Sequence, residues 1–193
     1  HVEISKQVGE TLEVAILRDG SQEKLSIEMR KAAPLVARLG EAPVPLYYTF
    51  GGVVFQVVTD GYLNSFHGYA PYEFVRYRNS LAGGPYRTTL SSEISNEREE
   101  IVVISSLLAD EVNRGYESFA SSILSSGNGT PMTSLAHLIE EIEGSEAPCL
   151  RLVLENGAVM IFDTAEVRER NPIILKKYNV YRDRTLEPEI DVM

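Results

Sequence analysis

Alternating apolar and polar positions at the start of the chain predict a β-hairpin over residues 1–31. Residues 12–17 and 25–29 both alternate, and Asp19-Gly20 lies between them. This dipeptide favours a tight turn between strands, because glycine adopts positive φ without strain. An isolated hairpin is only marginally stable in water. We therefore expect it to pack against further polypeptide, or to belong to a domain whose first part is missing.

A second pair of alternating runs lies at residues 150–154 and 159–163, around the turn-forming pair Asn156-Gly157. A helix is predicted before it, since Ser134 is a favoured N-cap residue and apolar side chains follow with helical spacing at positions 135, 138, 139 and 142. The first hairpin begins where such a helix would have ended. The pattern therefore predicts two related modules, the first of them truncated.

Two apolar stretches in the middle of the chain predict buried strands. Residues 46–58 are aromatic and β-branched on either side of Gly51-Gly52, which predicts a strand, a bend and a second strand. Residues 101–108 form a continuous apolar run. The aromatic residues between positions 62 and 77 are compatible with a satellite core or with a protein interface, and the sequence leaves both open.

Proline marks the expected interruptions. Pro34, Pro43 and Pro45 predict a linker over residues 32–45. A helix beginning at Thr164 is expected to be limited by Pro172. The acidic, proline-containing end of the chain is expected to be frayed.

Composition argues against several classes of function and adds little about the fold. The net charge of −10 argues against nucleic acid and against anionic membranes, since both bind clustered Lys and Arg. The longest apolar runs are far shorter than the roughly 20 residues that cross a bilayer. Cys149 is the only cysteine, and we interpret it as a small buried residue. The spacing of His, Cys and acidic residues predicts no metal site, and we expect no cofactor.

One loop imitates the nucleophile loop of a trypsin-like protease but has the wrong spacing. Two residues separate Ser80 from Gly83-Gly84-Pro85, whereas the oxyanion hole needs the serine amide next to its partners. The histidines that a triad would need are terminal (His1), in a predicted loop (His67) or on the predicted helix (His137). We therefore expect no catalytic triad, and an independent hydrolase using Ser80 and His67 is the weakest hypothesis.

Several segments together carry a family likeness. Their order along the chain is 8–20, 47–55, 107–116, 128–129, 135–140 and 163–175. In this order and spacing they resemble the C-terminal region of Deg/HtrA (Do-like) serine proteases, with the closing strands of one PDZ domain followed by an atypical second PDZ domain. The resemblance covers nearly the whole chain and is strongest over 46–178. Gly127 departs from the family pattern, which has an apolar residue there, and this puts the local strand register in question.

The resemblance implies an α+β fold that is mainly β, a PDZ-like partly open β-barrel with flanking helices, preceded by the β-hairpin remnant of another PDZ domain. The implied domains are the remnant (1–31), a linker (32–45), the PDZ-like domain (46–180) and a tail (181–193).

A peptide groove is also implied, because PDZ domains bind peptide C-termini by β-augmentation. The glycine pair would offer backbone N–H groups to the carboxylate, a strand would pair with the peptide and a helix would form the other wall. The residues concerned are Gly51, Gly52, Val53, Val54, Phe55, Leu135, His137, Leu138 and Ile139. The alternative is that Gly51-Gly52 only forms a bulge between core strands.

We therefore expect a non-catalytic region of a serine endopeptidase of this family, acting in substrate or peptide recognition, in regulation or in oligomerisation. The implied partners are peptide or protein segments, the protease domain of the same protein, and further copies in a homo-oligomer. The alternative is a purely structural assembly module whose groove is filled by its own side chains or tail.

Overall fold

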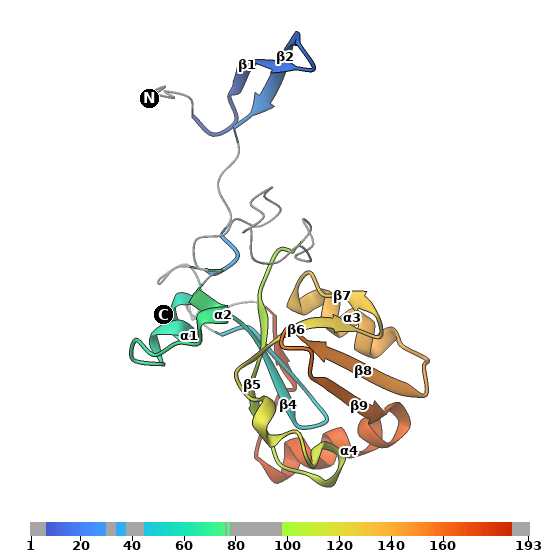
Figure 1. Cartoon of the computed structure of the whole chain (residues 1–193). Helices are drawn as coiled ribbons and strands as arrows, with labels where there is room; N and C mark the ends of the chain where they lie inside the picture. The colour runs from blue at the N-terminus through green and yellow to red at the C-terminus, as the bar shows by residue number, and fades with distance from the viewer. Residues whose placement is uncertain (1–6, 30–33, 38–44, 76, 78–97, 187–193) are drawn as a thin grey trace. The chain divides into compact units, whose positions relative to one another are not determined.

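A computed structural model describes residues 7–29, 34–37, 45–75, 77 and 98–186 of this chain (Figure 1). The chain divides into two units, His1–Ala33 and Pro34–Met193. Each unit is described by itself below.

The first unit is the predicted hairpin. Strands β1 (Thr11–Arg18) and β2 (Ser21–Glu28) are antiparallel along their whole length. Asp19 and Gly20 join them at φ of 50° and 79°, the positive values that a two-residue hairpin turn requires. One face is apolar, because Leu12 lies opposite Ile27 and Val14 opposite Leu25. The assignment of this hairpin to a separate domain stays a prediction.

The second unit is built on an eight-stranded sheet with the order β10-β3-β4-β5-β6-β8-β9, and β7 pairs with β6 off this path. All of these pairs are antiparallel. The strands are β3 (Tyr47–Phe50), β4 (Val53–Val57), β5 (Val102–Leu107), β6 (Ser122–Gly127), β7 (Thr130–Pro131), β8 (Cys149–Leu154), β9 (Val159–Asp163) and β10 (Arg184–Thr185). The fold is mainly β with an open sheet, so the predicted fold class is confirmed.

Register shifts bend the sheet at two places. One lies between Val54 and Phe55 on β4, and the other between Leu124 and Ser126 on β6, next to Gly127. Such irregularities insert an unpaired residue and increase the local twist. The register question raised by Gly127 therefore corresponds to a real irregularity in β6.

Helices and 3₁₀ turns flank the sheet. They are α1 (Asp60–Asn64), α2 (Tyr72–Val75), η1 (Glu111–Asn113), η2 (Glu117–Phe119), α3 (Leu135–Gly144) and α4 (Thr164–Lys177). Figure 1 shows α1 and α2 together, apart from α3 and α4. Ser134 is the N-cap of α3, as predicted, and its Oγ accepts the His137 N–H at 3.1 Å.

The expected limit at Pro172 is wrong, because α4 continues through this proline to Lys177. A proline inside a helix removes one backbone hydrogen bond and strains the preceding turn. Buried Val167 and Ile174 lie on either side of it, so tertiary packing holds both halves of the helix in place.

Strand β5 separates two hydrophobic cores, which explains its continuous apolar run. Val102 and Ile104 contribute to the main core, whereas Ile101 and Val103 contribute to a second one. The second core also contains Leu35, Val36, Val58, Leu63, Phe74, Tyr77 and Ile123, with Tyr62 and Phe66 packed against it. Most of the aromatic cluster is thus a satellite core, although Tyr69 and Tyr72 are exposed.

Two expected boundaries and the expected burial of Cys149 differ from the structure. Leu35 and Val36 lie in the second core, so residues 34–37 of the predicted linker belong to the second unit. Residues 184–185 of the predicted tail form an edge strand. Cys149 is exposed rather than buried, because Leu150 and Leu152 take the inward positions of β8.

Candidate functional site

Gly51 and Gly52 form the tight turn between β3 and β4. Their φ values are +59° and +78°, and Phe50 pairs directly with Val53. A Cβ on Gly51 would lie 2.4 Å from Val167 Cγ2, and one on Gly52 would lie 2.4 Å from Leu108 O. Glycine is therefore required at both positions, for backbone conformation and for the close approach of other segments.

Polar groups of the protein itself occupy this turn. Asn171 on α4 accepts the Gly51 N–H through Oδ1 at 3.0 Å. Asn113 donates through Nδ2 to Gly51 O at 2.8 Å, and Leu108 N–H donates to Gly52 O at 2.7 Å. The Gly51 N–H, a donor that a peptide carboxylate would need, is thus already bonded to a side chain.

Strand β4 is paired along both edges. Val54 lies opposite Thr49 of β3 on one side and opposite Ser106 of β5 on the other. Addition of a peptide strand requires a free edge with unpaired N–H and C=O groups. In this conformation Val53, Val54 and Phe55 have no such edge.

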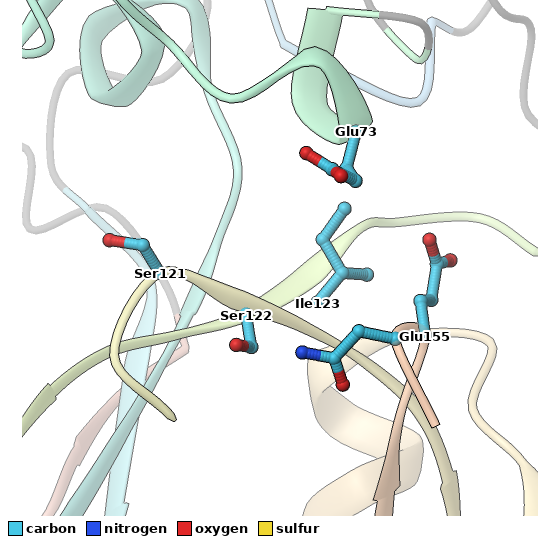
Figure 2. Close-up of a pocket in the computed structure, with 6 residues that line it drawn as sticks. Glu73, Ser121, Ser122, Ile123 and Glu155 are labelled. Carbon is cyan, nitrogen blue, oxygen red and sulfur yellow. The ribbon is translucent and has the colours of Figure 1, made fainter. Parts of the chain in front are cut away.

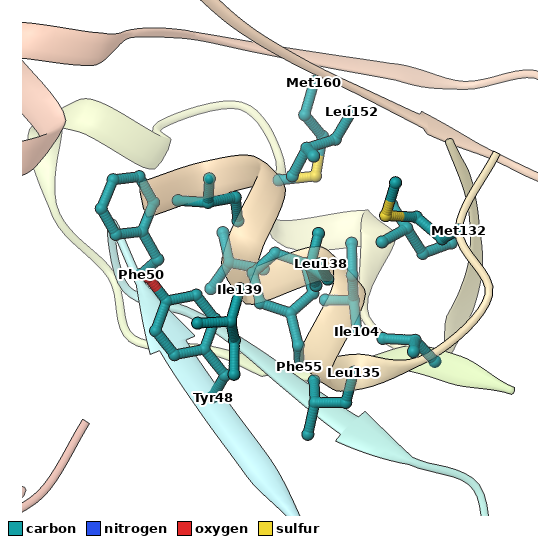
Figure 3. Close-up of a cluster of buried hydrophobic side chains, with 14 of the residues drawn as sticks. Tyr48, Phe50, Phe55, Ile104, Met132, Leu135, Leu138, Ile139, Leu152 and Met160 are labelled. Carbon is teal, nitrogen blue, oxygen red and sulfur yellow. The ribbon is translucent and has the colours of Figure 1, made fainter. Parts of the chain in front are cut away.

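The predicted groove wall on α3 faces the core. Leu135, Leu138 and Ile139 are buried in the main cluster, which also contains Val53 and Phe55 (Figure 3). The structure therefore brings these five predicted residues together, but as packed neighbours.

His137 lies on the outer side of α3. Its Nδ1 lies 3.0 Å from Thr133 Oγ1 and its Nε2 4.0 Å from Glu141 Oε1. The side-chain contacts of this predicted groove residue are therefore with Thr133, just before its own helix, and with Glu141 on that helix.

A charged cluster anchors the start of η1, the element whose Asn113 contacts the glycine turn. Asp110, whose side chain is 3% exposed, accepts three hydrogen bonds from the Arg170 guanidinium on α4 at 2.7–3.1 Å. These bonds hold the pKa of the Asp110 carboxyl below its usual value. Lys177 Nζ donates to Ala109 O at 2.8 Å. The cluster connects η1 to α4, the two elements whose asparagines contact Gly51.

Sequence reasoning did not single out Asn113, Asn171, Asp110 or Arg170. The sequence carries one local pattern that indicates two of them, because Asp110 and Asn113 have the N-cap to N3 spacing of a capping box. Their long-range partners carry no local pattern and depend on the packing of α4.

Comparison with known proteins places this architecture in a family. A family model described as a PDZ domain matches residues 39–187. This chain belongs to the PDZ domain family. The chain is 29% identical over 175 residues to putative protease Do-like 12, mitochondrial, of Arabidopsis thaliana, covering 91% of this chain and 30% of the relative.

Two further Arabidopsis thaliana proteins are similar to most of the chain. Protease Do-like 4, mitochondrial, is 29% identical over 180 residues, covering 93% of this chain and 30% of the relative. Protease Do-like 2, chloroplastic, is 25% identical over 190 residues, covering 96% and 30%. The chain thus spans less than a third of the length of these curated relatives, and the predicted resemblance to the PDZ region of Do-like proteases is confirmed.

A hollow of about 180 Å³ lies between α2 and the sheet, lined by Glu73, Ser121, Ser122, Ile123, Glu155 and Asn156 (Figure 2). Glu155 at its wall accepts Arg98 Nη1 at 2.8 Å and the Tyr77 hydroxyl at 2.6 Å. The carboxylate is thus engaged in a buried ion pair that ties Arg98 and Tyr77 to the loop after β8.

Of the residues considered for catalysis, His67 and His137 lie among the described residues. His67 lies at φ 51° in the exposed turn after α1. His1 and the loop that contains Ser80 lie outside the described residues. Over the described ranges, three or more His, Cys, Asp or Glu side chains nowhere converge as metal ligands. Over the same ranges, each helix is too short or too polar to cross a membrane.

Proposed function

We propose that this chain is a non-catalytic PDZ region of a Do-like serine endopeptidase and serves the assembly and regulation of that protease. Among the roles considered, capture of a peptide carboxylate at Gly51-Gly52 is the one that its geometry favours least. The parent activity is proposed from relatives that are named proteases and of which this chain spans 30%.

The observation that carries the proposal is the closed glycine turn. A carboxylate-binding loop needs free N–H groups, and an added peptide needs an unpaired strand beside it. Here Asn171 accepts the Gly51 N–H, and β3 and β5 pair with both edges of β4. Opening this site would break these contacts and part of the main core, since Val53 and Phe55 pack against α3.

A peptide titration with a matched chemical control tests the proposal. A peptide library is titrated into ¹⁵N-labelled protein, each sequence once with a free C-terminal carboxylate and once as the amide. We expect no carboxylate-dependent shift of the Gly51 and Gly52 amide signals, and a concentration-dependent dimer in light scattering.

Two results would overturn it. Saturable binding that is lost on amidation and moves both glycine signals would show that the turn captures carboxylates. A chain that stays monomeric at every concentration, and that also leaves the activity of its protease unchanged when deleted from the parent, would remove the assembly and regulatory role.

A further inference from the structure

The last described strand lies in a site that recognises an extended segment through its backbone. Arg184 of β10 lies opposite Tyr48 of β3, and Thr185 lies opposite Tyr47. Asp183 O accepts the Thr49 N–H at 2.6 Å, and the Tyr47 hydroxyl donates to the carbonyl of residue 182 at 3.1 Å. Residues 182–185 therefore extend the sheet in the way that a bound peptide does in β-augmentation.

The same site also holds an arginine side chain. The Arg184 guanidinium lies 5.0 Å from the centre of the buried Tyr48 ring, and Nη2 donates to Glu143 Oε1 at the end of α3. Arg184 Nε also donates to Asp183 Oδ1 at 3.1 Å, and Nη2 to Asp183 Oδ2 at 2.8 Å. An aromatic face and a carboxylate together are typical recognition elements for arginine.

Among the described residues, the anchoring of the chain changes just before this strand. The N–H of Val180 donates to Leu175 O at 2.9 Å, so the connector after α4 is anchored up to Val180. Tyr181, which is 97% exposed, then leads into the strand. Arg184 and Thr185 are only half-buried, whereas Val167 and Ile174 anchor α4 in the interior. Release of β10 therefore uncovers the β3 edge and the Tyr48 ring under Arg184, while α4 stays anchored in the interior.

We propose that the β3 edge is an exchange site that accepts residues 182–185 of a second copy of this chain, with the two copies inserting their strands reciprocally. The occupant is argued from the segment that fills the site within one chain. A second copy supplies the same backbone and the same arginine, so each contact with Tyr47, Tyr48, Thr49 and Glu143 is reproduced.

Reciprocal exchange closes with two-fold symmetry, so the β3 edge of each copy stays paired and a chain of copies does not propagate. This inference deepens the proposed assembly role and rests on it.

Disulfide trapping between two differently labelled chains tests the exchange. One chain carries Tyr47→Cys and the other Thr185→Cys, and both carry Cys149→Ser. These positions are directly opposed in the β10–β3 pair, where Cα atoms lie about 5.5 Å apart, a separation that suits a disulfide. We expect the mixed disulfide, identified by mass, to form about tenfold faster than by random collision, because exchange raises the local thiol concentration.

Three controls keep the result interpretable. The exposed Cys149 of an otherwise unchanged chain, mixed with the Thr185→Cys chain, gives the collision rate. A single chain with Tyr47→Cys and Thr185→Cys shows that the pair can close. Glu143→Gln added to the Tyr47→Cys chain should speed trapping about two- to fivefold, because it removes a surface ion pair that holds the chain's own strand and this strand must leave first, whereas Glu140→Gln on the same helix should leave the rate unchanged.

Trapping no faster than the collision rate, while the single-chain pair closes, would overturn the exchange. If light scattering still shows a dimer in that case, the exchange is wrong and the assembly role stands.

Discussion

Asn113 is the side chain on which the closed glycine turn depends, and its chemistry allows a sharp perturbation. It is 2% exposed. Its Nδ2 donates to Gly51 O and to Leu108 O, both at 2.8 Å, while its Oδ1 accepts the Asp110 N–H at 3.0 Å. Asn113→Asp keeps the volume and the Oδ1 acceptor but places an oxygen against the two carbonyl oxygens.

The expected loss of stability follows from these contacts. A buried acceptor left without its donor costs about 1–3 kcal/mol. Two such carbonyls, Gly51 O and Leu108 O, predict a loss of about 4 kcal/mol at pH 7. A domain of this kind is stable by about 5–15 kcal/mol, so Asn113→Asp should fold but with a clearly lower urea midpoint.

The loss should also depend on pH. Burial beside two carbonyls favours the protonated form, so the pKa of the new carboxyl is raised in the folded state above its unfolded value of about 3.9. The destabilisation is therefore largest above the folded-state pKa. It shrinks as the pH falls through that value, because the protonated carboxyl regains one donor.

The assay is urea unfolding of both proteins at several pH values between 7 and 4. Asn156→Asp is the matched control, because Asn156 is exposed and its Oδ1 accepts the Ala158 N–H at 3.0 Å, a bond that a carboxylate keeps. We expect a change within about 0.5 kcal/mol for the control. A loss below about 1 kcal/mol for Asn113→Asp at pH 7, or one that does not vary with pH, would refute the reasoning.

Two further predictions concern the ion pair beside the turn and the far edge of the sheet. Asp110→Asn should destabilise the protein at pH 7, because Arg170 loses its ionised partner. The folded-state pKa of Asp110 is lowered from its usual 3.8. The stability difference between Asp110→Asn and the wild type should therefore be constant well above that value and vanish as the pH falls through the lowered pKa. Urea midpoints that differ equally at pH 7 and in acid would contradict this. Tyr116→Phe should cost about 1 kcal/mol, because the Tyr116 hydroxyl donates to Ile161 O at 3.0 Å and accepts the Ile161 N–H at 2.9 Å on edge strand β9. Hydrogen exchange should then accelerate at the Ile161 amide, and an unchanged rate there would show that the hydroxyl does not protect the edge.

The local elements of the fold were predictable because neighbouring residues determine them. The Asp19-Gly20 and Asn156-Gly157 pairs each lie between alternating runs, and both become hairpin turns. Ser134 ahead of an apolar helical face becomes the N-cap of α3. Turn chemistry and side-chain periodicity act over a few residues, so the sequence shows them directly.

The expectations that failed depend on contacts between distant segments. Pro172 predicts the end of a helix from local chemistry, but buried Val167 and Ile174 hold α4 together across it. Residues 181–193 are predicted to be a tail beyond the domain, but Arg184 within them contacts Tyr48 and Glu143 on other elements. Neither partner lies within 40 residues of Arg184 in the sequence, so local patterns could not identify the pairing.

Gly51-Gly52 shows why the candidate site was the hardest part to predict. A loop that binds a carboxylate and a turn that packs against its own protein both need glycine, because each brings foreign atoms close to a backbone with positive φ. In this chain Asn113 and Asn171 distinguish the two cases, because they bond to the O and the N–H of Gly51. They lie 62 and 120 residues from Gly51 in the sequence. The residue type at the turn therefore identifies a close approach, and only the tertiary structure identifies what approaches. For a divergent PDZ domain, the partners of the glycine amides are a better guide to peptide binding than the presence of the glycines.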